Sequence, residues 1–187
     1  DMVVGNHTEF GIPQRLIKEG IVTDSQSENI QHIMDTLDSR IIGVDCYNNL
    51  AKHCNEYIFY GTDHHWTALG AYYGYESFCE AAGLTPMDIT KAEKHSIEGF
   101  LGSLYTATYS EALANNTDTV YYYSLPNNTY ALMNERMSSS TITVDVYYPA
   151  ATAGELTYGV FCWGDTAQFV IHSDCKTGRK IAVVKDS

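Results

Sequence analysis

The sequence predicts an α/β fold that carries a β-rich insertion, and three observations lead to this prediction. Residues 1–83 alternate short apolar runs with stretches of helical periodicity. Residues 88–175 are rich in Thr, Val, Tyr and Phe, separated by Asn, Gly, Ser and Pro. An apolar run then returns at residues 180–185. Alternating strands and helices are typical of a parallel sheet covered by helices, whereas short strands between turn residues are typical of antiparallel β-structure.

Four apolar runs are the expected strands of the parallel sheet. They are residues 2–4, 41–44, 57–60 and 180–185. Strands of a parallel sheet are covered on both faces, so they form continuous apolar runs rather than alternating ones. The last run follows the turn signal Thr177-Gly178, and we expect it to be a central strand.

Two helices are predicted in the first half of the chain. In residues 24–38 the apolar side chains recur at spacings of three and four, with Ser27 or Asp24 as the N-cap. A second helix is predicted from Thr67, its cap, to residue 82, with Gly83 as its terminator. Glycines at positions 70 and 74 would let this helix approach a neighbour closely.

The insertion is expected at residues 88–175, with strands at 119–124, 141–148, 157–163 and 168–172. The chain of 187 residues is 44% hydrophobic, which suits a single domain over residues 1–187. We expect this domain to be truncated at both ends, because the chain starts in a predicted strand and stops directly after another. A leader or membrane anchor would then precede residue 1.

Charge and cysteine content narrow the functional classes. The net charge of −12 opposes binding to phosphate backbones, which argues against a nucleic-acid partner. The five cysteines show no zinc-finger spacing. Cys162 and Cys175 either pair across a hairpin or stay free thiols, so the cysteines leave the compartment open. The fifteen tyrosines suit faces that stack on sugars, or they fill half-buried strands.

The segment YGTDHHWT at residues 60–67 is the most informative in the chain. It lies between a predicted strand and a predicted helix, where ligands bind in α/β folds. Three interpretations are open. Asp63 could orient a histidine that serves as a general base, the Asp63-His64-His65 cluster could bind a metal, or these residues could cap the helix and bond locally. An Asp-x-Asp cluster, which a two-metal phosphoesterase would also need, is missing, so no metal is expected.

A general base needs a nucleophile, and Ser187 is the best candidate. It ends the apolar run 180–185, so its hydroxyl should lie at the carboxyl edge of the sheet, on the side of Asp63 and His65. Cys46 is a rival, but no cation or helix start flanks it to lower its pKa. Without further context, Ser187 would be an ordinary cap or loop serine.

The segment from Tyr60 to Tyr75, with the core TDHHWTALGAYY, resembles the signature of the DHHW proteins. The similarity continues through residues 78–84, GFLGSLY at 99–105, and residues 178–187. These proteins resemble the SGNH-hydrolase-like family of bacterial polysaccharide O-acetylation proteins, including the alginate acetylation enzymes. In that group an Asp-x-His pair precedes a serine at the end of a later strand.

The resemblance implies a three-layer α/β/α SGNH-like domain and an acyl-transfer site. Asp63 matches the orienting acid, His65 the base and Ser187 the nucleophile, with no cofactor. His64, Trp66 and Asp186 are the expected substrate-binding residues. The implied activity is O-acetylation of an extracellular or cell-envelope polysaccharide, with a membrane-bound O-acyltransferase as acyl donor and an extracytoplasmic location.

Two other functions remain open on the sequence. A carbohydrate esterase would use the same three residues with water as acceptor. A non-catalytic carbohydrate-binding or envelope-assembly module would use its tyrosine-rich faces and need no triad. The sequence does not separate transfer from hydrolysis, because the difference lies in which nucleophile reaches the acyl-enzyme.

Overall fold

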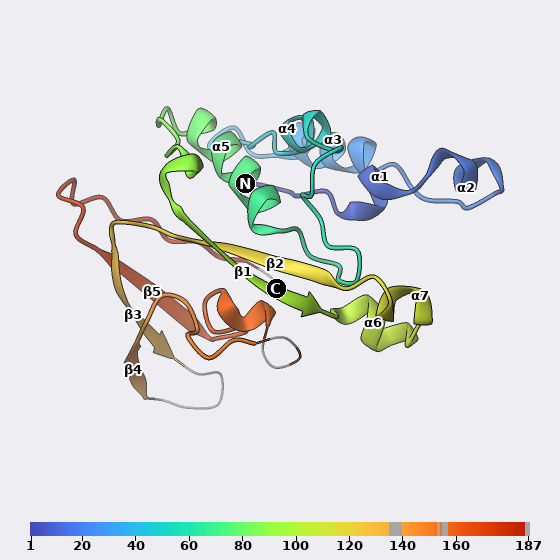
Figure 1. Ribbon diagram of the computed structural model, residues 1–187. Helices are drawn as coiled ribbons and strands as arrows, with labels where there is room; N and C mark the ends of the chain where they lie inside the picture. Colours follow the sequence, from blue (N-terminus) through green and yellow to red (C-terminus); the bar gives the residue numbers. More distant parts are fainter. Residues whose placement is uncertain (135–139, 153, 155–156, 186–187) are drawn as a thin grey trace.

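The computed structural model describes residues 1–134, 140–152, 154 and 157–185 (Figure 1). Its strands form two small antiparallel sheets, one of order β1-β2 and one of order β4-β3-β5. The three-layer α/β/α arrangement predicted from the sequence is therefore wrong, because the described residues contain no parallel sheet for helices to cover on both faces.

Helices precede the first strand of the chain, and further short helices separate the first strand from the second. The helices are α1 (His7–Gly11), α2 (Gln14–Lys18), α3 (Gln26–Thr36), α4 (Tyr47–Lys52), α5 (Ala68–Ala81), α6 (Ser103–Thr108) and α7 (Glu111–Ala114), with 3-10 turns η1 (Ile89–Lys91) and η2 (Tyr158–Val160). The strands are β1 (Glu93–Phe100), β2 (Asp118–Ser124), β3 (Asn128–Asn134), β4 (Thr141–Val144) and β5 (Gln168–Ser173). Helices α1–α5 lie on one side of the β1–β2 ribbon, and the three-stranded sheet lies on the other (Figure 1).

The apolar runs expected to build a parallel sheet make almost no ladder hydrogen bonds. Residues 2 and 44 form one isolated parallel bridge, and Phe59 bridges antiparallel to Trp66. The run 180–185 forms no strand, and Ile181, Val183 and Val184 are exposed. An apolar run becomes a strand only where a neighbouring strand pairs with it, and apart from these two bridges no described segment pairs with these runs.

Both helices predicted from the sequence form in the structure, as α3 and α5. Helix α5 begins and ends within one residue of the predicted limits, Thr67 Oγ1 accepts a hydrogen bond from the Gly70 amide at 3.3 Å, and Gly83 follows at φ +64°. The close approach predicted for Gly70 is confirmed, since an added Cβ would lie 2.3 Å from the Ile58 carbonyl oxygen. In α3 the N-cap is Ser25, one residue after the candidate Asp24.

The β-rich region is antiparallel, with differences in detail. Strands β2 and β5 match predicted segments within one residue, β4 fills the first half of its predicted segment, and β1 and β3 were not predicted. The segment 157–163 contains the η2 turn (Tyr158–Val160) instead of a strand, and Cys162 and Trp163 have positive φ angles of 49° and 60° that interrupt an extended backbone. In β1 a bulge between Glu98 and Phe100 brings Phe100 opposite Asp118 on β2.

Two buried clusters meet at the segment 57–60. Ile58 packs with Cys46 and Leu50, and Tyr60 packs with Phe100 and other residues of the second cluster, Val120 and Val160. Because Ile58 belongs to one cluster and Tyr60 to the other, this segment joins the helical side of the molecule to the β-ribbon. The motif at residues 61–67 follows directly from this junction.

No helix in the described part of the chain is long and apolar enough to cross a bilayer.

Candidate active site

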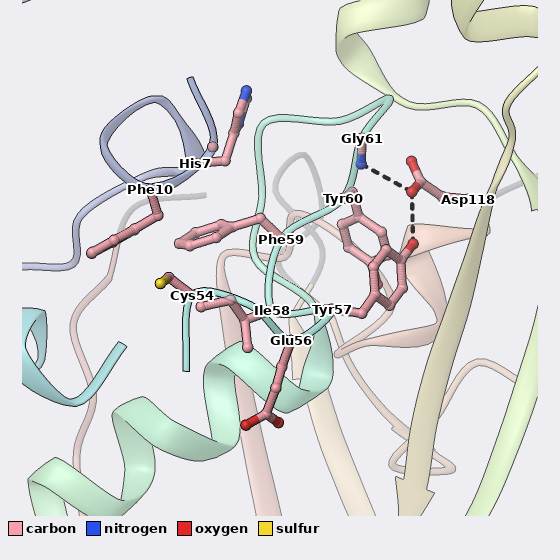
Figure 2. Close-up of a pocket in the computed structure, with 11 residues that line it drawn as sticks. His7, Phe10, Cys54, Glu56, Tyr57, Ile58, Phe59, Tyr60, Gly61 and Asp118 are labelled. Carbon is pink, nitrogen blue, oxygen red and sulfur yellow. Dashed lines mark hydrogen bonds between the residues drawn. The ribbon is translucent and has the colours of Figure 1, made fainter. Parts of the chain in front are cut away.

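The loop before Asp63 is held by a buried carboxylate from the start of β2. Asp118 accepts hydrogen bonds from the amides of Gly61 (2.9 Å) and Thr62 (2.6 Å), from Thr62 Oγ1 (2.6 Å) and from the Tyr57 hydroxyl (2.6 Å). Figure 2 shows the bonds from Gly61 and Tyr57. A buried carboxylate with four donors fixes the backbone around it, because each donor would otherwise be left unpaired.

Thr62 also ties this loop to the start of α6. Its hydroxyl oxygen accepts a hydrogen bond from the Gly102 amide at 3.1 Å. Its carbonyl oxygen accepts from the amides of Leu104 (3.0 Å) and Tyr105 (3.2 Å). Thr62 is fully buried. The motif is therefore fastened on one side by β2 and on the other by the segment that follows β1.

Asp63 is buried, and both of its carboxylate oxygens accept hydrogen bonds. Its Oδ2 accepts from the Ser103 amide at 2.7 Å, and its Oδ1 accepts from the His65 amide at 2.9 Å and lies 2.5 Å from His65 Nδ1. Burial alone would raise the pKa of this carboxyl. The Ser103 and His65 amides and the His65 imidazole outweigh burial and hold the pKa below its usual value. Asp63 is therefore an ionised acid at neutral pH.

His65 is held on two sides. Asp63 binds its Nδ1, and the ring stacks on Tyr158 with centroids 4.3 Å apart and planes 17° from parallel. Its Nε2 makes no hydrogen bond to any residue that the structure describes. An imidazole bound by a carboxylate at Nδ1 leaves Nε2 as the proton acceptor. The predicted contact between Asp63 and His65 is confirmed.

His64 forms a second, separate pair with Ser103. The Ser103 hydroxyl lies 2.5 Å from His64 Nδ1 and 3.3 Å from the His64 amide nitrogen. The His64 and His65 rings lie against each other with centroids 3.8 Å apart. The His64 side chain is 54% exposed, compared with 17% for His65. Of the two histidines, His64 is therefore the one that presents more of its ring to solvent.

Three ligating atoms of Asp63, His64 and His65 lie within 4.8 Å of one another, so this cluster could offer up to three ligands to a metal ion. The hydrogen bonds compete with that use. Asp63 and His65 Nδ1 bind each other, and Asp63 also holds two backbone amides. A metal at these atoms would have to break that pair, so the arrangement fits proton transfer better than coordination.

The other candidates from the sequence lie at different places. Trp66 packs into the cluster of Cys46, Leu50 and Ile58, and its ring lies under Gly74 of α5. Cys46 is also buried, and burial, assisted by the charge of Asp45, raises the pKa of its thiol to about 11. Such a thiol stays protonated at neutral pH and is a poor nucleophile. Asp186 and Ser187 lie outside the described residues.

Sequence reasoning did not single out the residues that support the motif. Ser103 lies within GFLGSLY, which the resemblance to the DHHW proteins covers without giving Ser103 a role, and Asp118 and Tyr158 carry no signal of their own. His7 also lies close to the site. Burial lowers the pKa of its imidazole, the Asp63 carboxylate opposes this shift and His64 adds to it. Its Nδ1 is buried without a hydrogen-bond partner among the described residues.

A cleft of about 460 Å³ lies beside the motif. Figure 2 shows the aromatic rings that line it, with Gly61 and Asp118 at one end. Its lining residues are His7, Phe10, Gly11, Cys54, Glu56, Tyr57, Ile58, Phe59, Tyr60, Gly61 and Asp118. Asp63 and His65 do not line it, so the cleft adjoins the acid–imidazole pair but does not contain it.

Solved structures share this fold. A DHHW family protein from Eubacterium siraeum DSM 15702 has a TM-score of 0.80 and 30% identity, over 95% of this chain and 58% of that one. Bacillus cereus PatB1 has a TM-score of 0.69 and 17% identity, over 92% of this chain and 61% of that one. This chain therefore spans less than two thirds of either solved chain.

The two solved structures define a class of proteins that share the fold of this chain. The family model for "DHHW protein" matches residues 1–187. The chain belongs to the DHHW family. No curated protein matches it. The 17% identity to PatB1 establishes a shared fold and nothing further.

Proposed function

We propose that this protein is a serine O-acyltransferase in which Asp63 orients His65, His65 is the general base and Ser187 is the nucleophile. The observation that carries the proposal is the 2.5 Å contact between Asp63 Oδ1 and His65 Nδ1, with Nε2 of the same ring left for a reacting group. A buried, ionised carboxylate in this position fixes the imidazole tautomer and stabilises the imidazolium that forms during reaction.

The last described residue before the proposed nucleophile gives further support. Lys185 acts electrostatically on Cys162: burial raises the pKa of that thiol, and the Lys185 charge partly opposes the rise. Cys162 in turn acts on Tyr158, whose ring stacks on His65. Lys185 therefore lies within electrostatic range of Cys162, and Cys162 within range of Tyr158, which supports the choice of Ser187, two residues further along the chain, as the partner of His65.

The proposed reaction has two halves. In the first, Ser187 Oγ attacks the acyl carbonyl carbon while His65 Nε2 takes the serine proton. The bond between the acyl carbon and the donor oxygen then breaks, and His65 gives its proton to that oxygen. In the second half an acceptor hydroxyl attacks the acyl-serine, and His65 takes its proton. The acyl–Ser187 bond breaks, and Oγ regains a proton from His65.

The acceptor in this proposal is a hydroxyl of an extracellular or cell-envelope polysaccharide, and the acyl group is acetyl. Both come from the resemblance of the motif to polysaccharide O-acetylation proteins. The same resemblance supports an extracytoplasmic location and a membrane-bound O-acyltransferase as the acyl donor. The acidic surface, with a net charge of −12, suits a neutral glycan better than a polyanion.

The experiment uses the purified protein with an activated acetyl ester, with and without added oligosaccharide. We expect acetyl release, and an acetyl adduct on Ser187 seen by intact-mass and peptide mass spectrometry. Ser187→Ala and His65→Ala should each lower the rate by roughly 10³-fold or more. Acetyl appearing on the sugar supports transfer, and acetate alone indicates the esterase with the same triad.

Two control variants leave the site untouched: Ser173→Ala for the serine and His32→Ala for the histidine, both exposed. They should retain the parent rate. If Ser187→Ala and His65→Ala kept the parent rate as well, the triad would be wrong. A parent protein that bound polysaccharide without turnover would indicate a non-catalytic module, and an activity abolished by a chelator and restored by a divalent metal would indicate metal chemistry at Asp63, His64 and His65.

A further inference from the structure

The Nδ1 atoms of the two adjacent histidines, His64 and His65, have different kinds of hydrogen-bond partner. His65 Nδ1 binds a carboxylate, which is an acceptor, so Nδ1 carries the ring proton and Nε2 is a lone pair. His64 Nδ1 binds the Ser103 hydroxyl, which can donate. The chemical character of His64 therefore depends on which way the hydrogen bond to Ser103 runs.

The surroundings of Ser103 decide that direction. The hydroxyl oxygen of Ser103 already accepts a hydrogen bond from the His64 amide at 3.3 Å. The structure gives the Ser103 hydroxyl hydrogen one acceptor among the described residues, namely His64 Nδ1 at 2.5 Å. Donation from Ser103 Oγ to Nδ1 satisfies both groups at once. It leaves the ring proton of a neutral His64 on Nε2.

The imidazole rings of His64 and His65 lie beside each other at the site. The Nδ1 atoms of His65 and His64 are 2.5 Å and 3.9 Å from one carboxylate oxygen, Asp63 Oδ1. The rings lie against each other at 3.8 Å between centroids, with planes 36° apart. Because the centroids are this close, the Nε2 atom of each ring lies close to the other ring. One is a proton acceptor and the other a proton donor.

We infer that His64 is a catalytic hydrogen-bond donor to the acyl oxygen and that Ser103 is the positioning residue that sets its tautomer. This inference rests on the proposed function. In that reaction the carbonyl oxygen of the acyl group gains negative charge when a hydroxyl attacks the carbonyl carbon. Each attacking hydroxyl passes its proton to His65. The N–H of His64, beside His65, can stabilise the negatively charged carbonyl oxygen, as the donors of an oxyanion hole do.

The first test reads the tautomer directly and needs no activity. Two-dimensional NMR that correlates the ring nitrogens and ring protons of histidine distinguishes a protonated Nδ1 from a protonated Nε2. We expect His64 to carry its proton on Nε2 and His65 on Nδ1 in the parent. In Ser103→Ala the His64 signals should move toward a mixture of tautomers, while His65 stays as it was. A proton on His64 Nδ1 in the parent would overturn the assignment of Ser103.

The second test measures kcat and KM for an acetyl ester in a matched pair of variants. The side-chain amide of Gln reaches about as far as Nε2, whereas that of Asn reaches only about as far as Nδ1. We expect His64→Gln to keep kcat within a few-fold of the parent, and His64→Asn to lose about 100-fold in kcat with little change in KM. Equal losses in the two variants would overturn the donor role.

The failures of the two proposals can be told apart. Thr108→Ala, on an exposed turn of the same helix as Ser103, should match the parent in both tests. A parent without acyl-transfer or esterase activity would overturn the proposed function and the donor role together, and the NMR result would still decide how Ser103 sets the His64 tautomer. An active parent in which His64→Asn turns over as fast as His64→Gln overturns the inference alone.

Discussion

The Asp63 side chain lies directly against the α-carbon of Gly102. A Cβ added to Gly102 would lie 2.2 Å from Asp63 Cβ and 2.4 Å from Oδ2. The φ of −91° at this position is open to any residue, so the requirement for glycine comes from the close approach and not from the backbone conformation. The acid of the site is thus positioned by the absence of a side chain on the facing segment.

We predict that Gly102→Ala pushes Asp63 away from the Ser103 amide. The variant should be less stable by about 1–3 kcal/mol, the usual cost of overpacking a filled interior, and its acyl-transfer rate should fall. Urea unfolding and the acetyl-ester assay would measure the two effects. Gly61→Ala is the matched control, since its nearest neighbour would be Asp118 Oδ1 at 3.7 Å. Equal stabilities for the two variants would contradict the prediction.

Asp118→Asn should disturb the motif without touching any proposed reacting group. The amide of Asn would point two hydrogens at a site where the amides of Gly61 and Thr62 and two hydroxyls now donate. We expect a loss of about 2–4 kcal/mol in the free energy of unfolding, measured by chemical denaturation. Tyr57→Phe removes one of the four donors and should cost only about 1 kcal/mol. The reverse ranking would show that Asp118 does not organise the loop.

The ionisation of Asp63 gives stability a defined pH dependence. The pKa of this carboxyl is lower in the folded protein than its ordinary value of 3.8. Its contribution is therefore fully present above about pH 4 and is lost as the pH falls through the lower, folded value. In unfolding measurements from pH 7 to pH 3, the difference in the free energy of unfolding between the parent and Asp63→Asn should become smaller below about pH 4. A stability difference that is constant over this range would be inconsistent with an ionised, hydrogen-bonded carboxylate.

Four of the five cysteines should react with a thiol reagent in a definite order. Cys175 is exposed, and hydrogen bonds from Thr177 lower its pKa, so it should react first, ahead of the exposed Cys54. Burial raises the pKa of Cys46 to about 11, and Cys79 is equally buried. These two should be modified only after unfolding. Kinetics with an aromatic disulfide at pH 7.5, with peptide mass spectrometry to locate each adduct, would measure the order, and rapid labelling of Cys46 in the folded protein would contradict it.

Features encoded by neighbouring residues were predictable from the sequence. The cap at Thr67 and the terminator at Gly83 define α5 within one residue because both act over a single helical turn. The contact of Asp63 with His65 was predictable for a similar reason, since two residues on one turn can reach each other. Residues 60–67 therefore carried enough information for the core of the site.

The sheet was not predictable from the same signals. A compact apolar run such as residues 180–185 has the composition of a buried strand, but pairing depends on a partner that the run itself does not specify. The strand β1 was missed for the opposite reason, because Glu93, Lys94 and Glu98 make it look like a surface segment. The supports of the motif, Asp118 and Ser103, lie 56 and 40 residues from their partners Thr62 and Asp63, and single-sequence patterns do not report such contacts.

Those long separations also bear on when the site forms during folding. Contacts between residues so far apart require large loops to close, so they form late and make folding slow. A peptide spanning residues 57–82 would hold Asp63 and both histidines yet lack the Asp118 carboxylate and the Ser103 amide that fix them. A fluctuation that detaches the β1–β2 ribbon would remove the Asp118 carboxylate that holds the loop before Asp63. Amide hydrogen exchange at Thr62 and Ser103 should therefore report how often the motif loses these supports.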